Sequence, residues 1–375
     1  MLKEGIAGLL NRPDQNQPVL DVLRSIAILL VFGGHFAGTF QARDWVNALP
    51  VVHFGWTGVD LFFVLSGFLI GMQLLKELKR TGNIRIGRFL LRRGMRIWPL
   101  YYALILFLLV EIALVGRSPS GIVADTLYVS NYFHNQVGGG WSLSTEEQFY
   151  ILAPLLLLVG FRVLKKERLW ILPLAVVVCL NITRAIVIHH SSLPEADLRQ
   201  KLYLPMYTHA DGLAVGLLLA WGYVFRPAWL QSRTIRWLMA GALLCAGLGL
   251  YRVRPVLTNF TSLGLIYGAV TVLGLGLGSD QVHGILNWRG FYWISRLSYG
   301  MYLNHFGVLE HLGARLLPWR LAHGEVAFWL CCGVVFVVSL GLAVLTYLLV
   351  EWPFLYLRDR WIGGKPRKAA VAVGE

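Results

Sequence analysis

Charged residues are scarce in this sequence of 375 residues. Only 14% of them are Asp, Glu, Lys or Arg, whereas soluble proteins contain roughly 25%. At the same time 56% of the residues are apolar, far more than a disordered chain contains. The composition therefore excludes a soluble enzyme and a disordered protein, and it predicts a membrane protein whose apolar surface faces lipid.

Cysteine is rare as well. The sequence has four cysteines, no two of them in a CxxC arrangement, and all four lie in apolar runs. A fold held together by disulfides is therefore excluded. The sequence also lacks an HExxH motif and the histidine spacings typical of zinc sites, so we expect no metal.

Long apolar runs make up most of the chain. Ten of them are close to the roughly 20 residues that a helix needs to cross a bilayer. They cover residues 19–40, 55–75, 97–115, 148–164, 169–188, 206–225, 235–251, 257–278, 293–314 and 326–350. No other segment is long enough for a separate soluble domain. We therefore predict an all-α, polytopic membrane protein with a single domain over residues 1–375.

Basic residues are distributed unevenly between the two sides of this arrangement. Lys and Arg gather in the even-numbered connections and in both terminal segments, including a basic tail at 358–375. Because short cytoplasmic loops retain Lys and Arg, we expect both termini in the cytoplasm and a multi-pass protein of the plasma or bacterial inner membrane. The net charge of +14 then reflects topology and contact with anionic membrane lipids, and we expect no nucleic-acid partner.

Ionisable residues inside the runs are the first candidates for function, because each is expensive to place in hydrocarbon. The first run contains Arg24 and, eleven residues later, His35. Eleven residues are close to three helical turns, so both side chains face the same side, about 16 Å apart. This arrangement favours one long cavity. Alternatively, Arg24 reaches the lipid phosphates and His35 only bonds a neighbouring helix.

Two carboxylates follow toward the outer side of the predicted membrane. Asp60 lies at a depth comparable to that of the first-run histidine, where it can orient an imidazole, or it merely begins the second helix. Glu146 lies in the segment GGGWSLSTEEQFY, before the fourth run. Ser144 and the acids after it resemble a capping box. A cap explains neither Trp141 nor Tyr150, so a functional site is the better interpretation of this segment.

Further polar clusters lie on both sides. The segment RFLLRRGMRIWPLYY places Arg93 and Arg96 on one helix face at the cytoplasmic surface, within a basic loop over 76–96. This loop either anchors the topology or binds a polyanion such as a nucleotide phosphate. Nearer the outer side, YTHADGLAVG contains Asp211 and RLSYGMYLNHF contains His305.

The chain resembles the acyltransferase-3 family of integral membrane acyltransferases, both in these residues and in their order along the sequence. The resemblance spans nearly the whole chain and rests on five short patterns. They match Arg24 and His35; Gly58, Asp60, Phe62, Phe63, Leu65, Ser66 and Gly67; Arg93, Arg96 and Pro99; Trp141, Ser142, Leu143, Glu146, Phe149 and Tyr150; and Ser298, Tyr299, Tyr302, Leu303 and His305. The sequence departs from the family pattern in one place, because His209 stands two residues before Asp211, where many relatives have Arg.

The resemblance implies transfer of an acyl group, most often acetyl from acetyl-CoA, to a hydroxyl group of a carbohydrate, glycolipid or cell-surface polysaccharide. An alcohol that attacks a thioester needs a base to remove its proton and a donor to stabilise the oxyanion. His35 is the expected base, or a transient acyl carrier, with Asp60 or Glu146 orienting it.

Donor and acceptor are expected to approach from opposite sides. Arg24, Arg93 and Arg96 would hold the phosphates of acyl-CoA on the cytoplasmic side. Trp141 is the clearest aromatic candidate for stacking on a sugar. The residues expected to bind substrate are Trp141, Ser142, Asp211, Tyr299 and His305.

Other functions fit some of the same residues. A proton-coupled transporter also uses Asp, Glu and His inside membrane spans, although the sequence shows no pair of interrupted helices in corresponding halves. An acyltransferase acting on a small hydroxylated metabolite would need the same groups. The sequence also leaves a homo-oligomer open.

Overall fold

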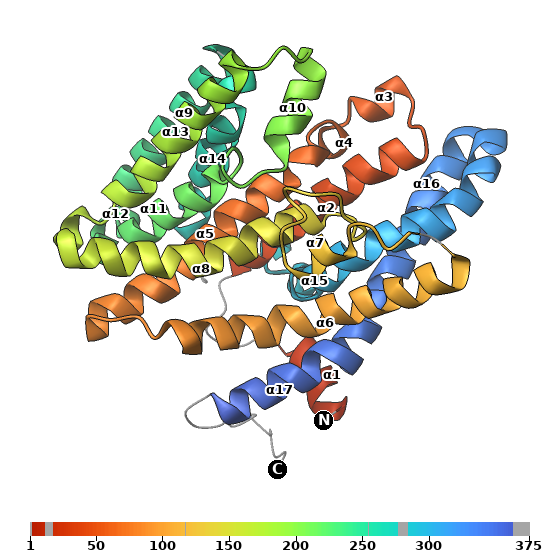
Figure 1. Cartoon of the computed structure of the whole chain (residues 1–375), viewed down its shortest axis with the longest axis horizontal. Coiled ribbons are helices and arrows are strands. Elements are labelled where there is room, and N and C mark those ends of the chain that lie inside the picture. The colour runs from red at the N-terminus through yellow and green to blue at the C-terminus, as the bar shows by residue number, and fades with distance from the viewer. Residues whose placement is uncertain (1, 12–17, 117, 254, 277–283, 363–375) are drawn as a thin grey trace.

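The computed structural model describes residues 2–11, 18–116, 118–253, 255–276 and 284–362. Within these residues all regular secondary structure is helical, and no strand occurs (Figure 1). The predicted all-α class is therefore confirmed. The basic tail predicted at 358–375 lies outside the described residues from residue 363 onward.

Each of the ten predicted apolar runs overlaps a helix. These helices are α2 (Pro18–Thr39), α5 (Gly58–Thr81), α6 (Ile86–Val115), α8 (Gly140–Val163), α9 (Ile171–His189), α11 (Asp211–Phe225), α13 (Arg233–Val253), α14 (Pro255–Leu275), α15 (Arg289–Val308) and α16 (Ala314–Thr346). Seven segments among the described residues are long and apolar enough to cross a membrane, the last of them being a joined run over 289–361. The polytopic membrane class is thus supported, whereas ten crossings and the side of the termini stay predictions.

Shorter helices connect the long ones. They are α1 (Leu2–Leu10), α3 (Asp44–Asn47), α4 (Pro50–His53), α7 (Ile122–Thr126), α10 (Glu195–Tyr203), α12 (Pro227–Gln231) and α17 (Trp352–Trp361). Helices α1 and α17 lie at the same edge of the molecule (Figure 1). A Cβ atom on Gly5 of α1 would meet the ring of Trp352 at 2.9 Å, so the first and last described helices are in contact.

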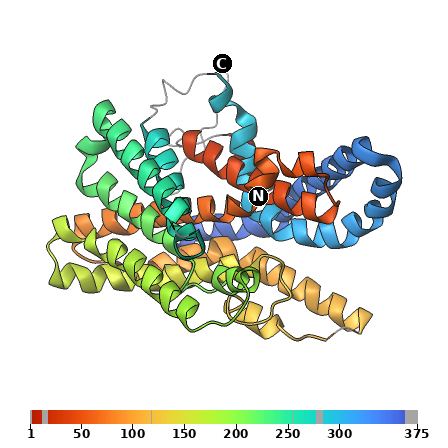
Figure 2. The same ribbon diagram turned by 90° about the horizontal axis from the view of Figure 1, so that it is seen from above.

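Helix α5 occupies the centre of the fold. It packs against α2 and α11, and α2 in turn packs against α15 (Figure 1). Helices α9, α11, α13 and α14 form a group on one side, and α15 with α16 forms a group on the other. Helices α6 and α8 run along one face of this arrangement (Figure 2). The residues of α2, α5, α6, α8 and α15 therefore meet in the interior.

Two helices begin earlier than the apolar runs predict. Helix α6 begins at Ile86 rather than near residue 97, and α8 begins at Gly140 rather than near residue 148. In both cases the additional turns carry charged side chains that an apolar-run criterion excludes. These turns hold Arg93, Arg96 and Glu146, so the helix extensions place the candidate residues on regular backbone.

The chain reverses direction within α16 and forms a helical hairpin. Within α16 the chain has a non-helical residue, Gly324, with φ +70° and ψ −146°. This left-handed φ suits glycine, which has no Cβ to clash. The two arms of the hairpin are visible beside each other at one end of the molecule (Figure 1). Arg320, just before the turn, donates to the carbonyl groups of Phe40 and Gln41 and so fixes the hairpin to the end of α2.

Glycines bring α5 and α11 into backbone contact. A Cβ atom added at Gly67 would lie 2.1 Å from the carbonyl oxygen of Leu213, and one at Gly216 would lie 2.2 Å from that of Val64. Such close approach of small residues is typical of helix packing in membranes, where dispersion contacts replace the hydrophobic effect. The central position of α5 therefore depends on these two glycines.

We expect Gly216→Ala to destabilise the fold, because the added methyl group must displace the backbone of α5. Overpacking of this kind costs about 1–3 kcal/mol. The apparent Tm of detergent-solubilised protein, followed by size-exclusion chromatography after heating, should fall by roughly 5 °C or more. Gly222→Ala on the same helix is the control, because its Cβ meets nothing within 4 Å. Equal melting of the two variants would contradict the packing described for α5 and α11.

Candidate active site

A cavity of about 110 Å³, lined by both charged and apolar side chains, lies where α2, α5, α6, α8 and α15 meet. Arg24 from α2, Arg93 and Arg96 from α6, and Glu146 from α8 all line it. Ser142 and Tyr299 line it too, as do Ser66, Tyr150, Ser298 and Tyr302. The structure thus brings residues from all five patterns of the sequence together around one cavity.

Three arginines give this cavity an excess of positive charge. Arg24, Arg93 and Arg96 are close enough to interact electrostatically with one another. Glu146 interacts electrostatically with Arg24 and Arg93. Within the described part of the chain the guanidinium groups of Arg24 and Arg96 make no hydrogen bond, although both face the cavity. Their N–H groups are therefore available to a ligand.

Glu146 is held in a fixed orientation. Ser66 donates a hydrogen bond to its Oε1 at 2.6 Å, and Tyr150 donates to its Oε2 at 2.8 Å. Tyr150 lies one helical turn further along α8, which explains why a tyrosine four residues after the acid matters. The capping interpretation of this segment is wrong, because α8 begins at Gly140 and Ser144 instead pairs with Ser130 at 2.8 Å.

His35 pairs with His305. The distance between His35 Nδ1 and His305 Nε2 is 3.0 Å, and the other nitrogen of His305, Nδ1, lies 2.6 Å from the carbonyl oxygen of Tyr302. A carbonyl can only accept, so His305 Nδ1 carries a hydrogen. In neutral His305 the Nε2 atom is then an acceptor, and His35 Nδ1 must donate to it. This assignment leaves the lone pair of His35 on Nε2.

The histidine pair is joined to the cavity through Tyr302. The phenol of Tyr302 lines the cavity and lies 2.6 Å from the hydroxyl of Ser142, while its backbone carbonyl fixes the tautomer of His305. Neither His35 nor His305 lines the cavity itself. The structure places His305 in direct contact with the candidate base, and its expected role in binding substrate stays a prediction.

Asp60 does not contact His35 as expected. Its Oδ1 lies 2.9 Å from Nε2 of His209, and both side chains are fully buried. His209 Nδ1 lies 2.6 Å from the carbonyl oxygen of Tyr203 and so must donate to it. Asp60 and His209 therefore share one proton across their 2.9 Å contact. A protonated histidine donates to a carboxylate as an arginine would, which gives a physical reason for histidine at this departure from the family pattern.

Trp141 is packed inside the protein. Its ring stacks on that of His209, with 5.5 Å between centroids and 24° between planes, and it also contacts Tyr203 and Phe63. Only 9% of its surface is exposed. Trp141 therefore covers the Asp60–His209 pair. The structure shows no open face of its ring on which a sugar could stack, so the expected stacking stays a prediction.

Asp211 belongs to a different group of buried charges. Its two oxygens accept hydrogen bonds from Arg184 at 2.7 and 2.9 Å, and Thr261 bonds it as well. Arg184 also donates to the carbonyl groups of Leu257 and Thr208. Both charged side chains are completely buried. Asp211 therefore connects α9, α11 and α14 through a buried ion pair and does not line the cavity. Its expected contact with substrate stays a prediction.

Arg184 and Tyr302 are two residues of these networks to which the sequence assigns no role. Arg184 was visible only as a basic residue inside an apolar run, and nothing in the sequence names Asp211 as its partner. Tyr302 belongs to the same sequence pattern as Ser298 and His305, but its connection of Ser142 to His305 depends on the meeting of α8 with α15. Both assignments required the fold.

We expect Asp211→Asn to destabilise the protein, because it leaves the buried charge of Arg184 without its counterion. Breaking a buried pair costs about 3–5 kcal/mol. The loss should appear as poor recovery of monodisperse protein and a lower apparent Tm. The double variant Arg184→Met/Asp211→Leu removes both charges and should recover most of the loss. If Asp211→Asn melts like the unmodified protein, Asp211 has no structural role.

Comparison with known proteins assigns the chain to a family. A family model described as an acyltransferase domain matches residues 18–348. Peptidoglycan O-acetyltransferase OatA of Listeria monocytogenes is 26% identical over 320 residues, which cover 78% of this chain and 49% of that protein. The putative peptidoglycan O-acetyltransferase YrhL of Bacillus subtilis is 27% identical over 324 residues, covering 78% and 48%. The putative O-acetyltransferase SACOL0978 of Staphylococcus aureus is 33% identical over 168 residues, covering 40% and 26%.

The chain thus spans about half the length of the two peptidoglycan O-acetyltransferases named above. No solved structure matches it significantly. The arrangement of the predicted motifs around one cavity agrees with the match over residues 18–348, and the protein belongs to the acyltransferase-3 family of acyltransferases.

Proposed function

We propose that this protein is a multi-pass O-acyltransferase of the cell membrane that moves an acyl group, most simply acetyl from acetyl-CoA, to a hydroxyl group of a cell-surface carbohydrate. The observation that carries the proposal is the hydrogen-bond chain from the Tyr302 carbonyl through His305 to His35, which leaves a basic nitrogen on His35 Nε2. The names of the relatives, two of which refer to peptidoglycan O-acetylation, support a polysaccharide acceptor.

The tautomers of His35 and His305 indicate which nitrogen acts as the base. His35 Nε2 takes the proton of the acceptor hydroxyl as its oxygen attacks the thioester carbonyl. When the tetrahedral intermediate collapses, the C–S bond breaks and the thiolate leaves. The imidazolium of His35 returns the proton to this thiolate, so the products are the ester and the free thiol. His305 keeps accepting from His35 Nδ1 throughout and thereby fixes the orientation of the ring.

Hydroxyl groups next to the histidine pair can stabilise the intermediate. Ser142 and Tyr302 lie 2.6 Å apart between the arginine-lined cavity and His305. One of them donates to the other, and the second hydroxyl hydrogen is directed to the carbonyl oxygen of Gly139, which lies 3.0 Å from Ser142 Oγ and 3.2 Å from Tyr302 Oη. This second hydrogen would turn from the carbonyl to the oxyanion as the intermediate forms. A positioned donor of this kind is worth about 10²–10³ in rate. The nearby arginines add positive charge to the same region.

The positions along α2 give the reaction a direction. Arg24 lies at the end predicted to be cytoplasmic, and His35 lies about 16 Å further along the axis. An acyl donor with an anionic end would therefore place that end toward the arginines and its thioester toward His35. The acceptor would approach from the outer side, and membrane lipids would surround the protein.

We expect His35→Ala to abolish acyl transfer, because general base catalysis supplies about 10²–10⁴ of the rate. His305→Phe should lower kcat by at least about tenfold with little change in KM for the donor, because it removes the acceptor that orients His35. His305→Gln keeps an oxygen that can accept from His35 Nδ1 and should retain more activity than His305→Phe. Release of free thiol from acetyl-CoA by protein in nanodiscs measures each rate.

The Gly222→Ala variant serves as the control for expression and handling, since it lies outside the cavity. Full activity of correctly folded His35→Ala would overturn the base assignment. Equal rates for His305→Gln and His305→Phe would overturn the orienting role of His305.

A further inference from the structure

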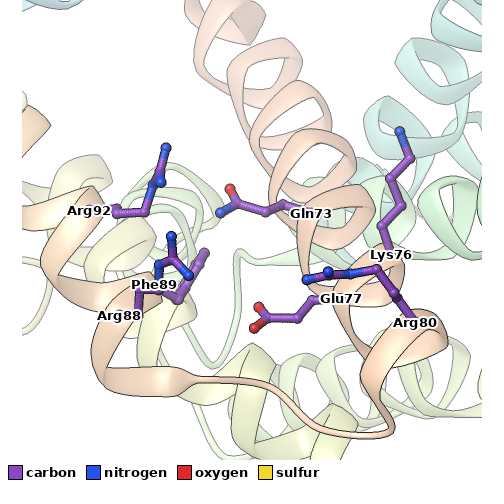
Figure 3. Close-up of a pocket in the computed structure, with 7 residues that line it drawn as sticks. All are labelled: Gln73, Lys76, Glu77, Arg80, Arg88, Phe89 and Arg92. Carbon is purple, nitrogen blue, oxygen red and sulfur yellow. The ribbon is translucent and has the colours of Figure 1, made fainter. Parts of the chain in front are cut away.

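A second hollow lies beside the first, at the ends of α5 and α6 that the basic loop predicts to be cytoplasmic. It has a volume of about 340 Å³ and is lined by Gln73, Lys76, Glu77, Arg80, Arg88, Phe89 and Arg92. Figure 3 shows side chains of α5, among them Gln73 and Glu77, facing Arg88 and Arg92 of α6 across an open space. We call this hollow the outer basic pocket.

Four cations and one carboxylate line the outer basic pocket, so it carries an excess of positive charge. Lys76, Arg80 and Arg88 are exposed to solvent. Glu77 Oε1 accepts from the backbone N–H of Arg85, and Arg88 donates to the carbonyl of Ile362 at the end of α17. Most of the cationic groups therefore have donors left for an anion.

The outer basic pocket adjoins the inner cavity through a hydrogen bond between their lining residues. Arg93, which lines the inner cavity, donates through Nη2 to Oε1 of Gln73, which lines the outer basic pocket, at 3.0 Å. The helical periodicity of α6 explains why its arginines line two different hollows. Arg88 and Arg92 are four residues apart and face outward into the pocket, whereas Arg93 and Arg96 are three apart and face the cavity.

The two hollows differ in volume, and the difference indicates which part of a ligand each can hold. Pockets that hold drug-sized ligands measure about 300–1,000 Å³. The inner cavity, with about 110 Å³, is too small for a nucleotide, whereas the outer basic pocket falls within this range. A phosphorylated nucleotide would also lose much more hydration in the buried cavity than at the exposed pocket.

We propose that the outer basic pocket binds the phosphates of the nucleotide end of the acyl donor, with Lys76, Arg80, Arg88 and Arg92 as their partners. This inference rests on the proposed function, and it moves the expected phosphate contacts from Arg24 and Arg96 to these four residues. The inner arginines then face the uncharged arm and the reacting carbonyl. Recognition depends on phosphate charge, so the enzyme discriminates among donors by the number of phosphates.

Anionic lipid headgroups have the same chemistry as nucleotide phosphates and are the other source of such a ligand. The hydrogen bond from Arg93 to Gln73 favours the donor, because it connects the pocket with the cavity in which the thioester would react. Measurements in nanodiscs of zwitterionic lipid alone remove the competing headgroups.

The test compares three donors that react at the same thioester. Acetyl-CoA, acetyl-3′-dephospho-CoA and S-acetylpantetheine carry progressively fewer phosphates. For the unmodified protein we expect KM to rise in this order. Lys76→Ala/Arg80→Ala should raise KM for acetyl-CoA at least about tenfold, with kcat little changed, and should leave KM for S-acetylpantetheine unaltered, because ion pairs with phosphate are the contacts removed. Both side chains are exposed, so folding should be unaffected.

Lys165→Ala/Arg168→Ala is the matched control, because it removes the same charge from another basic segment that does not line the pocket. An unchanged KM for acetyl-CoA in Lys76→Ala/Arg80→Ala, or an equal increase for all three donors, would overturn the inference. So would an equal effect of the control. If the unmodified protein releases no thiol from any of the three donors, with or without a saccharide acceptor, the proposed function itself fails.

Discussion

A charge within the hydrocarbon region of a membrane must find its partner inside the protein, and this constraint organises the fold. Arg184 and Asp211 satisfy it completely, because five hydrogen bonds hold the guanidinium between α9, α11 and α14. Arg24, Arg93 and Arg96 satisfy it only in part, because Glu146 is the one carboxylate among the cavity-lining residues, while Asp21 acts on Arg24 and Glu351 on Arg96 from outside the cavity. A satisfied pair stabilises helix contacts, whereas an excess of oriented donors leaves capacity for a ligand. The same residue type therefore has opposite roles on the two sides of α5.

The two buried histidine pairs differ in a similar way. His209 has a carboxylate partner and is enclosed by Trp141, Tyr203 and Phe260. His35 has a neutral partner, His305, and keeps a basic nitrogen. An aspartate beside His35 would favour its protonated form, in which no lone pair is left to accept a proton from a hydroxyl. The absence of that contact is therefore consistent with a base, while Asp60 secures the helices around it.

The helical class and most of the helices could be predicted from the sequence, because apolar runs of sufficient length admit only helices in a membrane. The sequence also predicts several residues of the site that the structure places around the cavity, namely Arg24, Arg93, Arg96, Ser142, Glu146 and Tyr299. It does not predict which residues the other candidates contact. Asp60 lies at the depth of His35, but depth along the membrane normal does not specify which helix faces it. Asp211 illustrates the same limit, because its partner Arg184 is on a helix whose position relative to α11 depends on packing. Trp141 has an aromatic ring of the kind that stacks on sugars, yet His209 covers this ring in the structure.

The division of basic residues along α6 links the fold to the chemistry. Burial of phosphate groups in a membrane interior is expensive, whereas an uncharged arm and a thioester enter such an interior at little cost. Helix α6 presents Arg88 and Arg92 to an exposed hollow and Arg93 and Arg96 to an enclosed one, an arrangement that would suit both parts of the donor proposed above. Helix α5 does the same, with Lys76 and Arg80 outside and Ser66 inside. The two hollows thus follow from helical periodicity acting on closely spaced polar residues. The hydrogen bond between Arg93 and Gln73 joins the two helices at the boundary between the hollows.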